Sequence, residues 1–185
     1  MTTYYRVVTD PLVAGLCLFG EPHDASGQLD ARRFTHCEKF GQPLTPLRIP
    51  ITVDGVQPEF GLGAFELPVV SPQLGKVLLA VAPGDVELIP AAAGQDPRSI
   101  LNVLSCVDCI DEDRTVGDKW PADSPRAGRI GTYRTIVDLF LDASRITGQS
   151  VFRVRGWEVA LVISEQVAQH LSEPQLRGIR LLQVT

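Results

Sequence analysis

A strand–helix–strand pattern occurs twice in this chain and constrains its fold more than any other feature. The first copy, "ELPVVSPQLGKVLLAVAPGDVELIP", begins at Glu66, and the second, "VALVISEQVAQHLSEPQLRGIRLLQV", ends at Val184. The two copies align without a gap, and the aligned pairs include Val69 with Val162, Ser71 with Ser164 and Leu78 with Leu171. The match preserves the helix start, the apolar helix face and the returning strand together. We therefore predict two related units that arose by duplication.

The start of each helix is marked by a serine. Ser71 is followed by Pro72, and serine at the N-cap with proline at the first helical position is a strong helix start. Ser164 occupies the same place in the second unit, so we expect it to cap the second helix. Pro83-Gly84 ends the first helix, and Gly178 marks the turn after the second.

The remaining segments predict further strands and complete an α+β fold with mixed or antiparallel sheet. Tyr4–Val8, Leu47–Val53, Ser99–Cys109 and Tyr133–Asp142 are rich in β-branched and aliphatic residues. The stretch 151–163 is either one strand kinked at Gly156 or two short ones. We expect one compact chain: a β and loop region (1–65) packed on the first lobe, the first unit (66–95), and a C-terminal lobe (96–185).

The composition is that of a globular protein, with 44% hydrophobic and 21% charged residues. The net charge of −5 argues against direct binding of nucleic acid, which requires a basic face. No apolar run approaches the ~20 residues of a membrane span, and Leu12–Gly20 is interpreted as structure rather than a signal peptide. We therefore expect a cytoplasmic protein that does not contact membranes, with its four cysteines as free thiols.

Cys106 and Cys109 form a C-x-x-C motif within "CVDCIDEDR". A zinc site needs about four ligands, and no second pair with ligand spacing occurs. If the strand is regular through both cysteines, their side chains point to opposite faces and cannot chelate one ion. The acids that follow would raise a thiol pKa, which disfavours redox catalysis. The same acids do not follow calcium-loop spacing. We therefore predict no metal and no cofactor.

Hydrolytic chemistry has little support in the sequence. The three histidines, His23, His36 and His170, lie outside any recognisable catalytic motif. We assign no catalytic residue and expect that the protein is not an enzyme.

The stretch from Asp111 to Gly131 is predicted to be a long surface loop. It combines acids with one aromatic residue, a composition that suits binding to a basic protein partner. Trp120 fits either an exposed contact or a buried loop anchor. Trp157 shares strand parity with Leu161 and Ile163, which favours burial. The candidate contact residues are Asp111, Glu112, Asp113, Arg114, Asp118, Trp120 and Glu158.

Three segments carry a resemblance to a known family: "LNVLSCVDCIDEDR", "GQSVFRVRGWEVALVISEQV" and "LRGIRLLQV". Together they resemble a family of bacterial immunity proteins, named after a myxobacterial member and found beside polymorphic toxin genes. The resemblance covers about residues 66–185. Cys106 departs from the family pattern, which implies that this cysteine is incidental. The matching residues are Asn102, Val103, Val107, Asp108, Cys109, Asp111, Phe152, Arg153, Ser164 and Glu165.

The resemblance implies an immunity protein that occludes the active site of a toxin from a contact-dependent or type VI secretion system. Asp111, Glu112, Asp113 and Trp120 would then engage basic residues of the toxin, and the acids would mimic phosphate if the toxin is a nuclease. The alternative is a small-ligand binder or enzyme with Asp108 and Arg153 in a pocket between the lobes. The toxin's identity and whether the chain forms a homodimer stay open. The positions assigned a structural role are Ser71, Asn102, Asp108, Cys109, Phe152, Arg153, Gly156, Trp157 and Ser164.

Overall fold

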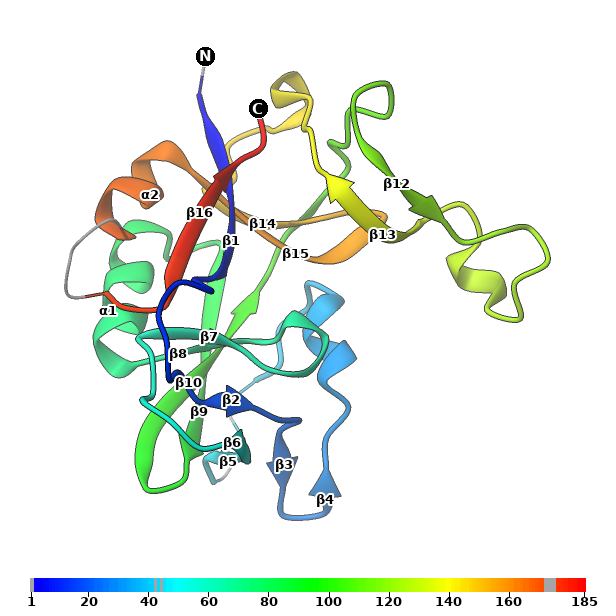
Figure 1. Ribbon diagram of the computed structural model, residues 1–185. Helices are drawn as coiled ribbons and strands as arrows, with labels where there is room; N and C mark the ends of the chain where they lie inside the picture. Colours follow the sequence, from blue (N-terminus) through cyan, green and yellow to red (C-terminus); the bar gives the residue numbers. More distant parts are fainter. Residues whose placement is uncertain (1, 42, 44, 172–175) are drawn as a thin grey trace.

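The computed structural model describes residues 2–41, 43, 45–171 and 176–185. These residues form an α+β fold with two α-helices and 16 strands, as the sequence predicts. Most of the strands gather in two main sheets, one of seven strands and one of five (Figure 1). The predicted fold class is thus confirmed.

The seven-stranded sheet has the order β4-β3-β5-β9-β10-β8-β7. Its pairs are antiparallel except that between β5 and β9, so the sheet is mixed. The longest pairing joins β9 and β10, which run together for eight residues each. In chain order the strands are β3 (His23–Asp24), β4 (Gly27–Gln28), β5 (Leu47–Ile49), β7 (Phe60–Leu62), β8 (Pro68–Val70), β9 (Val86–Ala93) and β10 (Asp96–Val103).

The five-stranded sheet has the order β11-β14-β15-β1-β16. Only β11 and β14 pair in parallel. The sheet brings the first strand of the chain beside the last, so the N-terminal strand belongs here and not with the rest of residues 1–65. The strands are β1 (Tyr4–Thr9), β11 (Cys106–Val107), β14 (Val151–Val154), β15 (Trp157–Ser164) and β16 (Ile179–Gln183).

The two predicted units have the same local topology. In the first, β8 and β9 flank β10, and α1 (Pro72–Val81) connects them. In the second, β15 and β16 flank β1, and α2 (Glu165–Leu171) follows β15. Each middle strand is antiparallel to both neighbours, so the outer strands of each unit are parallel. The helices contact each other (Figure 1). The origin of the two units by duplication stays a prediction.

The helix starts differ between the units. The Ser71 hydroxyl accepts a hydrogen bond from the Leu74 amide at 3.2 Å, which confirms the predicted cap. It also donates to the carboxylate of Glu59. Ser164 is instead the last residue of β15, and its buried hydroxyl has no hydrogen-bond partner within the described residues. Ser164 thus stands directly before α2, as predicted, but the predicted side-chain cap does not form.

Apolar side chains form three clusters that lie on the faces of the two sheets. The first fills the space between the sheets and includes both helices, through Leu74, Leu78, Val167 and Leu171. The second covers the other face of the five-stranded sheet, and the third packs η1 (Ala31–Thr35) on the other face of the seven-stranded sheet. The central strands are therefore covered on both faces.

Trp157 is buried, as predicted, but for a different reason. It lies in the second cluster with Ala160 and Val162, whereas Leu161 and Ile163 face the first. The register between β14 and β15 shifts at Arg153/Val154, and such an irregularity breaks the alternation on which strand parity depends.

Two predicted strands are interrupted, and the stretch 151–163 forms two strands, one of its two predicted alternatives. The stretch 47–53 divides at Pro50 into β5 and β6 (Ile51–Val53), and β6 pairs with β2 (Leu18–Phe19) in a separate small sheet. The stretch 151–163 is the hairpin β14–β15, with Gly156 at a φ of +89° in its turn. The stretch 99–109 breaks between Val103 and Cys106.

The predicted loop 111–131 also contains regular structure. β12 (Val116–Lys119) pairs with β13 (Tyr133–Asp138), and η3 (Ala127–Arg129) lies between them. We call residues 116–138 the arm, because this hairpin extends to one side of the two main sheets (Figure 1). The remaining short helices are η2 (Ala64–Glu66) and η4 (Ala143–Arg145). None of the helices in the described ranges is both long and apolar enough to span a bilayer.

Candidate functional site

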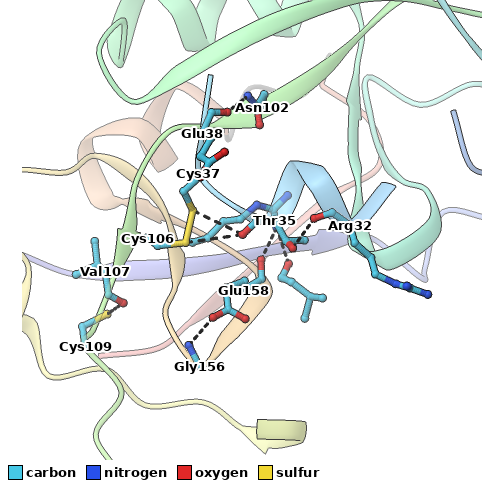
Figure 2. Close-up of a disulfide and its surroundings, with 12 residues drawn as sticks. Arg32, Thr35, Cys37, Glu38, Asn102, Cys106, Val107, Cys109, Gly156 and Glu158 are labelled. Carbon is cyan, nitrogen blue, oxygen red and sulfur yellow. Dashed lines mark hydrogen bonds between the residues drawn. A yellow bond between two sulfur atoms is a disulfide. The ribbon is translucent and has the colours of Figure 1, made fainter. Parts of the chain in front are cut away.

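Cys37 and Cys106 are joined by a disulfide bond (Figure 2). Their Cα atoms lie 5.8 Å apart, although 69 positions separate them in the chain. The prediction of four free thiols is therefore wrong, and so is the interpretation of Cys106 as incidental. Spacing alone could not reveal this bond, because the partner belongs to a segment without a recognisable motif.

Local structure presents Cys37 to its partner. It follows His36, the residue that ends η1, and its φ of +60° turns the chain sharply. The Asp30 side chain caps η1 by accepting from the Arg32 amide at 2.9 Å. Phe34 anchors the segment in the third apolar cluster. The cysteine thus extends from a well-held short helix.

The chain beyond Cys37 is held to the seven-stranded sheet by polar contacts. Asn102 donates from Nδ2 to the Glu38 carbonyl at 2.8 Å and to the Glu87 carboxylate at 3.0 Å. Glu87 also accepts from the backbone amides of Phe40 at 2.8 Å and Gly41 at 3.2 Å. Asn102, a residue of the resemblance motif, therefore positions the loop that carries Cys37.

Cys109 lies apart from the disulfide, although it is only three positions from Cys106 (Figure 2). It is wholly buried in the second apolar cluster, and its thiol contacts the Val107 carbonyl at 3.6 Å. Burial, together with the nearby Asp108 carboxylate, raises the pKa of Cys109 to about 12. The two cysteines therefore do not share a site, as the sequence analysis expected. The reason differs, because the regular strand assumed there ends at Val107. In the described residues, no three or more His, Cys, Asp or Glu side chains come together as a metal site.

The disulfide forms part of the wall of a cavity of about 510 Å³, here called the disulfide cavity. Four separate segments contribute to it: the end of η1, the β10–β11 connection, the connection between β12 and β13 in the arm, and the β14–β15 turn. Its lining residues are Thr35, His36, Cys37, Leu104, Cys106, Gly128, Arg129, Thr132, Arg155 and Glu158.

The disulfide cavity is lined by two arginines, of which only one forms an ion pair with a described residue. Arg129 forms an ion pair with Glu158 at 3.1 Å, and Glu158 also accepts from the Gly156 amide at 2.9 Å. The exposed Arg155 side chain makes no hydrogen bond or ion pair with any described residue. The cavity thus carries one guanidinium that no internal carboxylate neutralises.

Arg153 lies inside the protein beside this cavity. It is in register with Cys106 across the β11–β14 pair and has no exposed surface. Its Nη1 atom donates to the carbonyls of Glu158 and Val159, whereas Nε and Nη2 lack a partner in the described chain. Burial lowers its pKa to about 10, so the group remains charged at neutral pH. Because Arg153 is buried and Asp108 is exposed, the predicted pocket built on these two residues does not form.

The acids proposed as a contact surface lie beside basic residues. Four pairs form: Asp111 with Arg114 at 3.8 Å, Glu112 with Lys119, Asp118 with Arg134 at 3.6 Å, and Glu158 with Arg129 at 3.1 Å. Residues 111–134 contain five acidic and five basic side chains. The surface therefore carries paired charges instead of the unopposed acids that "DEDR" suggests. The ten residues are Asp111, Glu112, Asp113, Asp118, Asp123, Arg114, Lys119, Arg126, Arg129 and Arg134.

Trp120 is half-buried at the end of β12, between its two predicted environments. Its backbone amide donates to the Thr132 carbonyl at 2.9 Å, and its carbonyl accepts from the Gly131 amide at 3.1 Å. The Arg126 guanidinium lies 5.2 Å from the ring centroid. Trp120 thus closes the hairpin and retains part of its ring surface for contact.

The arm also exposes apolar side chains that the sequence analysis did not identify. Val116 is 55% exposed, Val137 74% and Ile130 43%. Val137 lies in the segment Tyr133–Asp142, whose composition is too apolar for both faces to be solvated. Strand alternation could not have revealed it, because Arg134 and Asp138 share parity with the buried Ile136 and would leave Val137 on the opposite, buried face.

The sequence matches no family model and no curated protein.

Proposed function

We propose that this chain is an immunity protein that binds a cognate bacterial toxin and occludes its active site. The resemblance motifs support the proposal, and so does one structural observation. The arm extends beside the main sheets and exposes Val116 and Val137 among charged side chains (Figure 1). Exposed apolar residues surrounded by polar ones are typical of protein-binding surfaces.

The ion pairs on and beside the arm could be replaced by ion pairs with a toxin. Glu112, Asp118 and their basic partners are largely exposed, and surface ion pairs of this kind contribute ~0–1 kcal/mol each. A basic toxin surface can therefore replace Lys119 and Arg134 as partners of these acids at little cost. If the toxin is a nuclease, the carboxylates would occupy phosphate positions and steer association.

The proposal is tested with the product of the neighbouring toxin gene, in a pull-down assay and a growth-protection assay. The double variant Val116→Asp/Val137→Asp should lose toxin binding and protection. Val53→Asp is the matched control, because Val53 is also about half exposed, at 51%, but lies in the separate small sheet. Retention of binding by the double variant would exclude the arm, and a metabolic enzyme in place of the toxin gene would exclude the function.

A charge variant tests the acidic part of the surface separately. Glu112→Lys/Asp113→Lys should reduce the association rate most at low ionic strength, because steering is screened by salt. An unchanged rate would mean that toxin recognition does not use these acids.

Small-ligand binding is a second candidate function, supported by the disulfide cavity and its unpaired Arg155. This cavity differs from the pocket expected around Asp108 and Arg153.

A further inference from the structure

The disulfide cavity places the bond between two partly buried cysteines next to cationic groups. Cys37 and Cys106 both retain partial solvent exposure, whereas the other two cysteines, Cys17 and Cys109, are buried. Arg129 and Arg155 line the same cavity as the bond. A sulfur atom in such a setting is accessible to an attacking group and lies in a positive field.

The positive field has two independent sources. Glu158 forms an ion pair with Arg129 and also interacts electrostatically with the buried Arg153, so Arg155 adds a charge that no described carboxylate pairs with at the cavity. Arg153 is in register with Cys106, and two of its donor atoms have no partner in the described residues. Both groups would stabilise negative charge that develops on Cys106.

The segments on both sides of the bond are held by other contacts. Asn102 and Glu87 fix the loop that follows Cys37. Cys106 belongs to β11, which pairs with β14, and the Arg153 amide donates to the Ser105 carbonyl at 2.8 Å. The bond can therefore open while the two sulfur atoms remain near each other, which is the condition for reversible exchange.

We propose that the Cys37–Cys106 bond is a thiol–disulfide exchange site that reacts preferentially with small anionic thiols. The carboxylate of such a thiol binds Arg155 in the disulfide cavity, and its thiolate attacks one sulfur atom of the bond. The sulfur–sulfur bond breaks, its electron pair leaves on the other cysteine as a thiolate, and a mixed disulfide forms. A second molecule of the same thiol releases the first as a ligand disulfide, so two thiols supply the two electrons.

Cys109 takes no part in this exchange. It is three positions from Cys106, as a resolving cysteine would be, but its sulfur is buried in the second apolar cluster and contacts the Val107 carbonyl. The C-x-x-C spacing therefore does not act as a dithiol motif, and the reactive pair consists of Cys37 and Cys106. This inference is independent of the proposed immunity function.

The experiment compares three small thiols that differ in charge: mercaptopropionate, mercaptoethanol and cysteamine. The folded protein is mixed with each, the reaction is stopped by alkylation, and mixed and reduced species are counted by intact-mass spectrometry. Rate constants are expressed per thiolate, which removes differences in thiol pKa. We expect mercaptopropionate to react about tenfold faster than mercaptoethanol, with cysteamine slowest. Added salt should reduce the difference.

Arg155→Gln carries the decisive comparison, because Arg155 is exposed and its loss should leave the fold intact. In this variant the advantage of mercaptopropionate should fall at least severalfold, with little change for mercaptoethanol. Arg48→Gln, an exposed arginine of β5, is the matched control and should retain the advantage. Equal rates for the three thiols in the unaltered protein would overturn the proposal. An undiminished advantage in Arg155→Gln, or adducts mapped to Cys109, would also overturn it.

Discussion

Cys106 and Cys109 are three positions apart but lie in opposite environments, Cys106 in the short strand β11 and Cys109 beyond its end. Cys106 is bonded to Cys37 at the edge of a cavity, whereas Cys109 lies in an apolar cluster with no exposed surface. The same spacing in a metal knuckle or a redox helix would place both sulfur atoms together. Here β11 ends at Val107, and the chain then carries Cys109 into the core.

This difference predicts selective labelling of the cysteines. After mild reduction of the folded protein, iodoacetamide should modify Cys37 and Cys106, while Cys109 stays unmodified. The pKa of Cys109 is about 12, so it remains a protonated thiol at mildly alkaline pH and is also shielded. Peptide mapping by mass spectrometry measures each site. Modification of Cys109 at the rate found for an unfolded control would contradict its placement.

The disulfide should stabilise the fold, because it closes a loop across 69 positions. In the chain-entropy description, a loop of this size contributes about 4 kcal/mol through the unfolded state. The double variant Cys37→Ser/Cys106→Ser should therefore unfold at a clearly lower urea concentration, with a native-like circular dichroism spectrum before the transition. An unchanged midpoint would show that the bond does not form in solution.

The sequence predicted the elements that depend on local signals. The first helix was located from Ser71 and Pro72, because the cap and the fixed proline φ act within one turn. The strand breaks at Pro50 and at residues 104–105 were missed, because composition does not show where sheet pairing changes. Ser164 directly precedes α2 as predicted, but its hydroxyl makes no capping hydrogen bond with a described residue. Pairing with β1 extends β15 to this residue, whose side chain is buried, and this packing could not be read from a local capping signal.

The candidate site was predictable only in part. The acids of "DEDR" lie on the surface as expected, but Glu112 pairs with Lys119 of the arm, and within the arm Asp118 pairs with Arg134. The contact between Asp118 and Arg134 depends on the pairing of β12 with β13, which no local sequence pattern predicts. The disulfide was missed because Cys37 and Cys106 meet only once two distant segments have packed.

The two serines that precede the helices should respond differently to substitution. Ser71→Ala removes a helix cap and should destabilise the protein by about 1 kcal/mol. Ser164→Ala removes a buried hydroxyl that has no partner in the described residues, so it should change stability by less than ~0.5 kcal/mol or improve it. Urea unfolding of both variants measures the difference. Equal losses would indicate that Ser164 acts as a cap in solution.

Tyr133 should titrate unusually late. Burial, together with the hydrogen bond it donates to Glu112 at 2.8 Å, raises its pKa from 10.0 to about 12. A raised pKa in the folded state means that the protonated phenol favours folding below about pH 10, and that this contribution is lost as the pH rises towards 12. Carbon NMR of labelled tyrosines should show this late signal. Glu112→Gln should lower the pKa of Tyr133, and an unchanged value would show that this carboxylate does not contribute.

Gly117 should be essential for the pairing that forms the arm. A Cβ atom at this position would lie 2.3 Å from the Thr135 carbonyl oxygen, a backbone atom that cannot move without separating β12 from β13. Gly117→Ala should therefore disorder the arm and loosen the second apolar cluster, which includes Tyr133 and Ile136, while the first and third clusters, which contain no arm residue, stay packed. Limited proteolysis should then cut between residues 111 and 134. Gly128→Ala is the matched control on the same arm, since its Cβ would enter open space, and it should resist the protease like the unaltered protein. If both variants resist equally, β12 and β13 do not pair as closely as the structure shows.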